Sequence, residues 1–245
     1  MSMLHLVMPM GGRGSRFQNQ AQDFPKPMIR LHGKPFFYWA TQSIRSHVDL
    51  SGLTFVVLRE HIDNYHIDEE ILAYFPEAHL CVIPEVLNGA VLTCMEGSKM
   101  VPAGTPVLFN DCDHFFRSTA FNCFCTKGRV NDLDGALLTF RSSEPRYSFL
   151  QYDAEGFVRR TVEKQAISED AICGAYYFKD TATFLLAAQE YLKVCGYAEY
   201  FMSGVYNTMA DQGQKIKGFA TDFHIPFGVP EEYRFALKAK EFETA

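Results

Sequence analysis

The sequence predicts an α/β fold with a mixed sheet that is mostly parallel. In the first half of the chain, short apolar runs alternate with longer segments of helical period, which is typical of parallel strands joined by helical crossovers. After Asp134 the pattern changes to alternating runs around turn-forming residues, which indicates antiparallel strands. Together the two patterns favour one sheet that contains both kinds of pairing.

Strands and helices alternate along the first half. The strand candidates are the apolar runs 4–9, 53–58, 80–84 and 105–110. The segments between them, 35–48, 61–75 and 88–101, are each long enough for several helical turns. His61 and His66 lie in the second of these segments, at a spacing that suits neither helical face well. We therefore expect both histidines to be solvated.

The second half is expected to begin with strands and to end with helices. Segment 147–164 predicts a hairpin that turns at 153–156, and the runs 135–140 and 171–178 predict further strands. Helical spacing follows in 184–192 and in parts of 200–213, and segment 230–242 begins with a proline at a helix-start position. No linker, low-complexity tract or internal repeat marks a boundary, so we expect a single domain over 1–245.

Composition and charge exclude several classes of protein. The net charge of −6 disfavours a polyanion such as DNA as a partner. The apolar N-terminus is interrupted by glycine after ten residues, too soon for a membrane span. The seven cysteines show no CxxC spacing that would suggest a zinc site, and we interpret them as reduced thiols of a cytoplasmic protein. A local cluster of basic residues could still bind a small anionic ligand.

The first strand is followed at once by a glycine-rich loop. Gly11, Gly12 and Gly14 lack side chains, so their backbone N–H groups can converge on an anion. A dinucleotide fingerprint would need a third glycine where this chain has Phe17, and a P-loop would need Gly-Lys-Ser/Thr where it has Gly14-Ser15-Arg16. The loop is therefore a phosphate nest of a different kind, GGxGxR.

Lys26 follows this loop between two prolines. Pro25 and Pro27 fix their own φ angles and bias the preceding residues toward extended conformations, so the lysine projects from a stiff segment. An ammonium held in this way could bridge the oxygens of a triphosphate. The alternative is an ordinary glycine turn with surface arginines, and it explains the loop but not the pinned lysine.

Two carboxylates close the strand candidate 105–110. Asp111 and Asp113 would lie at the carboxyl end of a parallel strand, where open α/β sheets bind ligands. Carboxylate oxygens next to phosphate suit Mg²⁺. An Asx turn that caps the next segment, or the DxD motif of a glycosyltransferase, would also account for this pair.

With these motifs in this order, the chain resembles the nucleotidyltransferases, especially the sugar-1-phosphate nucleotidylyltransferases, or NDP-sugar pyrophosphorylases. The resemblance implies a Rossmann-like (GT-A-like) three-layer sandwich with a nucleotide-binding half, 1–130, and an acceptor-binding half, 131–245. It implies that Arg16 and Lys26 are catalytic and that Asp111 and Asp113 hold Mg²⁺. It further implies that the nucleotide is bound by Gly11, Gly12, Arg13, Gly14, Ser15, Gly89 and Asp111, with Gly89 near the base.

The same resemblance assigns the acceptor site to the second half. Val162-Glu163-Lys164 is similar to a family motif whose glutamate contacts sugar hydroxyls and whose lysine contacts the sugar-bound phosphate, and Gly174 resembles a glycine on a strand that lines the acceptor site. The chain departs from the family at Pro226, which stands where relatives often have an aspartate that binds a second metal ion. Asp222 or His224 could replace that aspartate, or Asp111 and Asp113 could suffice.

The resemblance implies transfer of a nucleoside monophosphate from an NTP to a small phosphorylated acceptor with release of pyrophosphate. A sugar 1-phosphate is the expected acceptor, for surface polysaccharide or related biosynthesis, and a polyol, choline or amino-acid-derived phosphate is the alternative. A third hypothesis is a nucleotide-binding regulatory module without catalysis. We expect neither nucleic acid nor membrane as a partner, and a homo-oligomer stays open.

Overall fold

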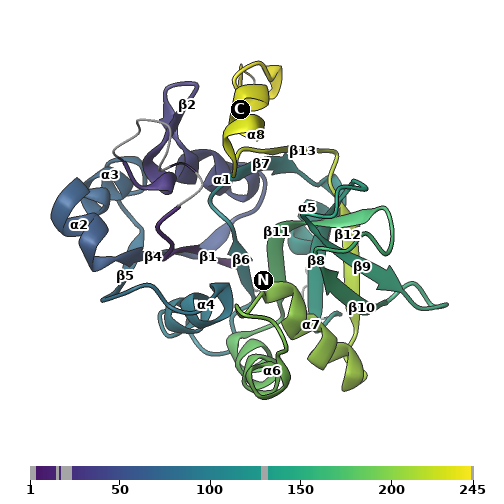
Figure 1. The fold of residues 1–245 in the computed structure, drawn as a ribbon. Helices are drawn as coiled ribbons and strands as arrows, with labels where there is room; N and C mark the ends of the chain where they lie inside the picture. Colours follow the sequence, from purple (N-terminus) through teal and green to yellow (C-terminus); the bar gives the residue numbers. More distant parts are fainter. Residues whose placement is uncertain (1–3, 15–16, 18–23, 128–131, 244–245) are drawn as a thin grey trace.

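The computed structural model describes residues 4–14, 17, 24–127 and 132–243 (Figure 1). Its strands are β1 (Leu4–Met10), β2 (Arg30–Leu31), β3 (Lys34–Pro35), β4 (Leu50–Leu58), β5 (His79–Ile83), β6 (Val107–Asn110), β7 (His114–Arg117), β8 (Gly135–Arg141), β9 (Ser148–Tyr152), β10 (Val158–Glu163), β11 (Asp170–Phe178), β12 (Ile216–Ala220) and β13 (Phe223–Pro226). Its α-helices are α1 (Phe36–Arg45), α2 (Arg59–Tyr65), α3 (Ile67–Tyr74), α4 (Ala90–Ser98), α5 (Thr119–Thr126), α6 (Thr181–Val194), α7 (Met202–Asp211) and α8 (Pro230–Ala236). Short 3₁₀ helices cover Lys26–Met28 (η2) and Lys240–Glu243 (η3).

One mixed sheet runs through the molecule in the order β10-β9-β11-β6-β1-β4-β5, with β8 paired to β11 and β12 paired to β8. The strands β6, β1, β4 and β5 pair in parallel, as do β8 and β12. Strand β11 runs antiparallel to β6, β8 and β9, and β10 runs antiparallel to β9. Among the described strands of this sheet, only β11 and β10 therefore run against the common direction, and the prediction of a mixed, mostly parallel sheet is confirmed.

Helices cover both faces of this sheet, as the three-layer prediction requires (Figure 1). Alternate residues of β1 divide between two cores: Leu6 and Met8 pack with α1, α3 and α5, whereas Val7 packs with α4, α6 and α7. This alternation is the period of a strand that is buried on both sides. In the described part of the chain, no helix combines the length and the apolar character that a membrane span needs.

A third apolar cluster joins the two ends of the chain above the sheet. Phe36 and Trp39 of α1 pack with Phe115 of β7 and with Phe227 and Phe242 near the C-terminus. The ribbon of β13 and β7 and the helix α8 lie together beside α1 in Figure 1. The C-terminal segment thereby contacts the first half of the chain, next to the loop that follows β6.

Several local predictions were wrong. The expected helix 61–75 is two helices, because His66 adopts a left-handed conformation with φ 53° between α2 and α3. His61 is buried at 3% exposure, so its predicted solvation is wrong, whereas the His66 side chain is exposed. The expected terminal helix 230–242 ends as an α-helix at Ala236. The sequence patterns also gave no indication of the ribbon that β7 and β13 form.

Candidate active site

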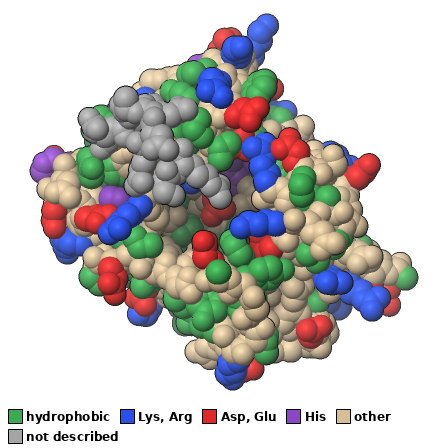
Figure 2. All heavy atoms as spheres, viewed as in Figure 1, with side chains coloured by type: hydrophobic (Ala, Val, Ile, Leu, Met, Phe, Trp, Pro, Cys, Tyr) green, Lys and Arg blue, Asp and Glu red, His purple; other side chains and the backbone are tan. Residues whose placement is uncertain are grey.

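A cleft of about 660 Å³ opens at the carboxyl ends of β1 and β6, a volume within the usual range for small-molecule sites. Acidic and basic side chains surround the hollow in the middle of the face shown in Figure 2. The residues around the cleft come from distant parts of the chain and include Gly11, Gly12, Arg13, Gly14, Lys26, Asn88, Gly89, Thr93, Asp111, Asp113, Glu199 and Gly228. The fold thus brings most of the predicted nucleotide-binding and metal-binding residues to one place.

The glycine loop begins directly at the end of β1 and packs tightly at two of its glycines. A Cβ atom on Gly11 would lie 2.7 Å from Ile83 Cδ1, and one on Gly14 would lie 2.5 Å from Lys26 Cβ. Gly14 also has φ +62°, which disfavours other residues. Around Gly12, by contrast, there is open space. The loop is therefore fixed at Gly11 and Gly14 and leaves room for a ligand at Gly12.

Lys26 begins the 3₁₀ helix η2 and points across the cleft. Its Nζ lies 2.6 Å from Asp113 Oδ2, and both side chains retain 23% exposure. Burial alone would lower the pKa of Lys26, but the carboxylate of Asp113 outweighs that effect and holds the pKa above its ordinary value. The ammonium is therefore charged at neutral pH. A phosphate entering the cleft would meet this ammonium beside the glycine loop.

Asp111 follows β6 at the point where β11 turns away from it. The backbone N–H of Asp111 donates to the carbonyl oxygen of Gly174 at 2.9 Å. Gly174 has φ +85° and lies where the pairing of β11 is irregular, and a Cβ atom there would lie 2.6 Å from Asp111 Oδ2. Burial raises the pKa of Asp111 to about 7, with a further contribution from the Asp113 carboxylate, while Lys26 opposes the shift. A cation is therefore the natural partner for Asp111.

Asp113 is held by the segment that follows β13. Its carbonyl oxygen accepts a hydrogen bond from the N–H of Phe227 at 2.8 Å, and a Cβ atom on Gly228 would lie 2.3 Å from its Oδ2. Pro226, where the sequence resemblance led us to expect an aspartate, pairs with His114 in the ribbon. This strand therefore brings backbone, and not a carboxylate, to Asp113.

Neither proposed replacement for the missing aspartate reaches the cleft. Asp222 accepts hydrogen bonds from Thr119 Oγ1 at 2.6 Å and from Arg117 Nε at 3.3 Å, at the start of α5. His224 lies with His114 and Cys173 behind the cleft. Asp113 is nevertheless near enough to His224 to oppose the lowering of its pKa, so the hypothesis that Asp222 or His224 completes this metal site stays a prediction.

The remaining donor set fits one hard divalent cation. Asp111 and Asp113 offer carboxylate oxygens at the lip of a cleft that is open to water, and oxygen ligands are what Mg²⁺ binds. Burial and, to a smaller extent, the Asp113 carboxylate disfavour the charged form of Asp111, and a bound cation would offset both effects. Substrate phosphates and water would have to supply the other ligands.

Gly89 has a structural role that the sequence did not reveal. Its backbone has φ 92° and ψ 167°, and a Cβ atom would lie 2.4 Å from the backbone nitrogen of Tyr200. The N–H of Val91 also donates to the carbonyl oxygen of Tyr200 at 3.2 Å. The glycine thus allows the loop before α7 to lie against the start of α4. Glu199 reaches the cleft through this contact, and no local motif marks it.

Glu163 and Lys164, at the end of β10, lie beside the cleft and not among its lining residues. The carboxylate of Glu163 accepts hydrogen bonds from Ser148 Oγ at 2.5 Å and from Ser203 Oγ. Glu163 is near enough to Asp111 to contribute to its raised pKa. Lys164 adopts φ 55°, and its Nζ lies 5.1 Å from the ring centre of Phe201. Glu163 thus lies near Asp111, whereas the Lys164 ammonium lies over Phe201.

Of Arg13, Ser15 and Arg16, Arg13 alone lies among the described residues. Arg13 Nε pairs with Glu60 Oε1 at 3.1 Å, and its side chain is 64% exposed. Arg13 therefore lies at the rim of the cleft, with its charge directed to α2. Ser15 and Arg16 lie outside the described residues, so their roles stay predictions.

Comparison with known proteins supports the fold. No protein-family model and no curated protein sequence matches the chain. A nucleoside-diphosphate-sugar pyrophosphorylase from Vibrio cholerae RC9 is similar in structure, with a TM-score of 0.82 and 22% identity over 96% of this chain and 100% of that one. The inositol-1-phosphate CTP transferase from T. maritima has a TM-score of 0.77 and 16% identity over 98% of each chain. A Bacillus anthracis protein assigned as a glucose-1-phosphate thymidylyltransferase, in complex with a sucrose, has a TM-score of 0.77 and 14% identity over 96% of this chain and 94% of that one.

Proposed function

We propose that this protein is a nucleotidyltransferase that transfers a nucleoside monophosphate from an NTP to a phosphorylated acceptor. The observation that carries the proposal is the meeting of Lys26 with Asp111 and Asp113 across the glycine loop in one cleft. Phosphoryl chemistry on an NTP needs this combination, because the protein must hold a polyanion and neutralise the charge that develops on it. The names of the three similar structures agree with the reaction class.

The reaction needs positioning and charge more than covalent help. An oxygen of the acceptor phosphate attacks the α-phosphorus of the NTP, a new P–O bond forms, and the bond to the bridging oxygen of pyrophosphate breaks. Lys26 would stabilise negative charge on the α-phosphate and on the leaving pyrophosphate, and the N–H groups near Gly12 would cradle the phosphates. The acceptor phosphate is already an anion, so the proposal includes no general base.

Asp111 and Asp113 are proposed to hold the magnesium ion. When bound, Mg²⁺ would neutralise part of the negative charge on the phosphates. In this proposal Lys26 leaves its ion pair with Asp113 and turns to the phosphates when the nucleotide and metal enter. Asp111→Asn should therefore raise the Mg²⁺ concentration needed for half-maximal activity, while Asp211→Asn on the exposed end of α7 should not. Equal magnesium curves for Asp111→Asn and wild type would remove Asp111 from the metal site.

The acceptor is proposed to bind at the Glu163 end, so that residues 1–130 bind the nucleotide and 131–245 bind the acceptor. Glu163 at the end of β10 and Gly174 in β11 lie near Asp111, and Lys164 follows Glu163 directly. A carboxylate suits hydroxyl groups, and an ammonium suits the acceptor phosphate. We propose a sugar 1-phosphate as the acceptor. Inositol phosphate is the second candidate, because one similar structure is a CTP transferase for that substrate and because this chain has Pro226 in place of the family aspartate.

A matrix of nucleotides and acceptors tests the function. The purified full chain with Mg²⁺ is given each of the common NTPs together with sugar 1-phosphates, inositol 1-phosphate, polyol phosphates or choline phosphate, and pyrophosphate release is measured. We expect one NTP and acceptor pair to give release well above that of either substrate alone. Nucleotide binding without release for any pair would support a regulatory module and overturn the enzymatic proposal.

We also propose that the protein works in the cytoplasm. All seven cysteines are free thiols, which fits the reducing conditions of the cytoplasm. The proposed partners are an NTP and the small acceptor.

A further inference from the structure

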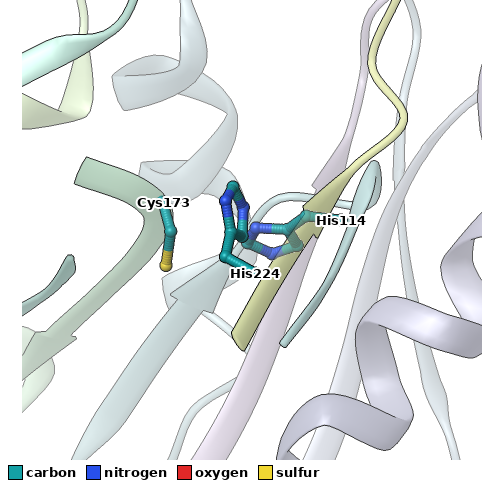
Figure 3. A group of neighbouring side chains, drawn as sticks. All are labelled: His114, Cys173 and His224. Carbon is teal, nitrogen blue, oxygen red and sulfur yellow. The ribbon is translucent and has the colours of Figure 1, made fainter. Parts of the chain in front are cut away.

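Three side chains that the proposed reaction does not use meet behind the cleft. His114 begins β7, Cys173 lies in β11 and His224 lies in β13, and one potential ligand atom from each lies within 4.8 Å of the other two. Figure 3 shows the two imidazole rings edge to face, with Cys173 beside them on its own strand. The ring centres of His114 and His224 are 5.6 Å apart. We call these residues the His-Cys-His cluster.

His224 has no hydrogen-bonding partner for either ring nitrogen, although both atoms are buried. Its ring packs against Phe140, with centres 4.1 Å apart. A buried imidazole normally pairs both nitrogens with protein or water, because an unpaired buried polar atom costs about 1–3 kcal/mol. The ring is thus held by apolar packing with its polar atoms left for a ligand.

His114 is oriented from the other side. Its Nε2 lies 3.0 Å from Asn110 Oδ1, and Asn110 Nδ2 in turn donates to the carbonyl oxygen of Ala40 at 3.0 Å. The second contact fixes the amide with its oxygen toward His114, so Nε2 of His114 is the donor to Asn110. A ring nitrogen that donates to a fixed oxygen is the usual outer partner of a metal-binding histidine. The ring also makes hydrogen bonds to the backbone of Asp111 and Cys173, and an ion bound on that side would replace them.

We propose that the His-Cys-His cluster binds one borderline-soft divalent ion, with Zn²⁺ as the best fit, at a site separate from the magnesium carboxylates. Two imidazoles and a thiolate are ligands that Zn²⁺ prefers and Mg²⁺ does not. Tetrahedral binding would bring the ligand atoms to about 3.5 Å from one another, a contraction that small side-chain rotations can supply. Water would be the fourth ligand. Binding releases the Cys173 thiol proton to solvent as the Zn–S bond forms.

The three side chains of the cluster differ in exposure, and they come from two different sheets. His114 and Cys173 are buried at 2% and 5% exposure, whereas His224 on β13 is only partly buried, so an ion would arrive from the His224 side. The ligands come from the main sheet through β11 and from the ribbon of β7 and β13. A bound ion would therefore tie the ribbon, which positions Gly228 beside Asp113, to the sheet.

Cobalt substitution tests the site without relying on activity. The chelator-treated, reduced full chain is titrated with Co²⁺ in the presence of excess Mg²⁺, and absorption is recorded. We expect a thiolate-to-cobalt charge-transfer band and strong tetrahedral visible bands that saturate at one ion per chain and are displaced by Zn²⁺. The same amount of Zn²⁺ should raise the melting temperature of the wild-type protein, while extra Mg²⁺ should not.

Matched variants decide where a metal binds. Cys173→Ser should lose the charge-transfer band, and His224→Phe should weaken Co²⁺ binding by at least about 10-fold. Cys125→Ser, which alters another buried thiol of the same core, should keep both the band and the affinity. Wild-type protein without the band and without a Zn²⁺-dependent shift in melting temperature would overturn the proposal, whether or not the variants fold. A band that persists in Cys173→Ser would also overturn it.

Discussion

At the scale of single residues, the glycine loop and the pinned lysine form one unit. Gly14 has no side chain at the point where the side chain of Lys26 crosses the loop, since a Cβ atom there would lie 2.5 Å from Lys26 Cβ. Pro25 and Pro27 restrict the backbone on both sides of the lysine. The motif GGxG and the motif PKP are therefore parts of one packing arrangement that aims an ammonium into the cleft.

Lys26→Ala should lower turnover by roughly 10²-fold or more, because one preorganised charge at a developing anion is worth about that much. Steady-state pyrophosphate release with the best substrate pair measures the effect. Lys99→Ala is the matched control, since that lysine is exposed and its ammonium pairs with Glu96 in the preceding turn of α4. Wild-type turnover in Lys26→Ala would contradict the proposed role.

Gly228→Ala should also impair the reaction while the protein stays folded. The new methyl group would lie 2.3 Å from Asp113 Oδ2, so the carboxylate must shift away from Lys26 and from the proposed metal. We expect weaker Mg²⁺ activation and lower turnover, with the circular dichroism spectrum unchanged. Gly196→Ala, where the methyl group would meet nothing within 4 Å, should behave as wild type. If Gly228→Ala and Gly196→Ala showed the same dependence of activity on Mg²⁺ concentration, the position of Asp113 next to Gly228 would not matter for the reaction, and the prediction would be wrong.

At the scale of elements, the loop before α7 depends on the start of α4. Gly89 and Tyr200 are in backbone contact, which a side chain on Gly89 would prevent. The same contact brings Glu199 to the lining of the cleft. Two segments that are far apart in sequence thus build one wall of the proposed nucleotide site.

Gly89→Ala should move this loop and weaken NTP binding. Gly33→Ala is the matched control, because Gly33 has a similar positive φ of +77° but open space around it. Both substitutions carry a backbone strain of ~1–3 kcal/mol, so a difference between them reports the contact with Tyr200. We expect only Gly89→Ala to raise the Kd for the NTP and to expose the loop to limited proteolysis. If Gly89→Ala and Gly33→Ala had the same Kd for the NTP, the loop before α7 would not be part of the nucleotide site.

At the scale of the whole molecule, buried histidines link stability to pH. His5 of β1 is 2% exposed, and its Nε2 lies 2.9 Å from Thr54 Oγ1. Burial, with a smaller contribution from the charge of His79, lowers the pKa of His5 from 6.5 to about 4. Burial likewise lowers the pKa of His61. These imidazoles are neutral in the folded protein, so protonation favours the unfolded chain.

The protein should lose stability as pH falls from about 6.5 to about 4, at up to ~1.4 kcal/mol per pH unit from His5 alone. The sign follows because the unfolded chain binds the proton first, and the loss stops below the folded pKa. Urea unfolding at about pH 7 and about pH 5 measures the slope. His5→Gln should flatten it, while His66→Gln at an exposed position should not. A wild-type slope in His5→Gln would contradict this origin.

The sequence by itself determined the fold class, the glycine loop with its lysine, and the carboxylates at the end of β6. These features are local: periodicity reports strands and helices, and glycine and proline restrict their own backbones. The same local signals could not show that His66 would interrupt a helix or that His61 would be buried, since both depend on neighbours from other elements.

Only the tertiary structure decided which distant residues meet. Gly228 reaches Asp113, Tyr200 reaches Gly89, and the three members of the His-Cys-His cluster converge from positions 114, 173 and 224. No spacing rule connects such positions, because their proximity arises from strand order and from the register between β7 and β13. The sequence thus determined how the phosphates of a nucleotide would be held, and the packing of the second half around Asp111 and Asp113 decided what surrounds them.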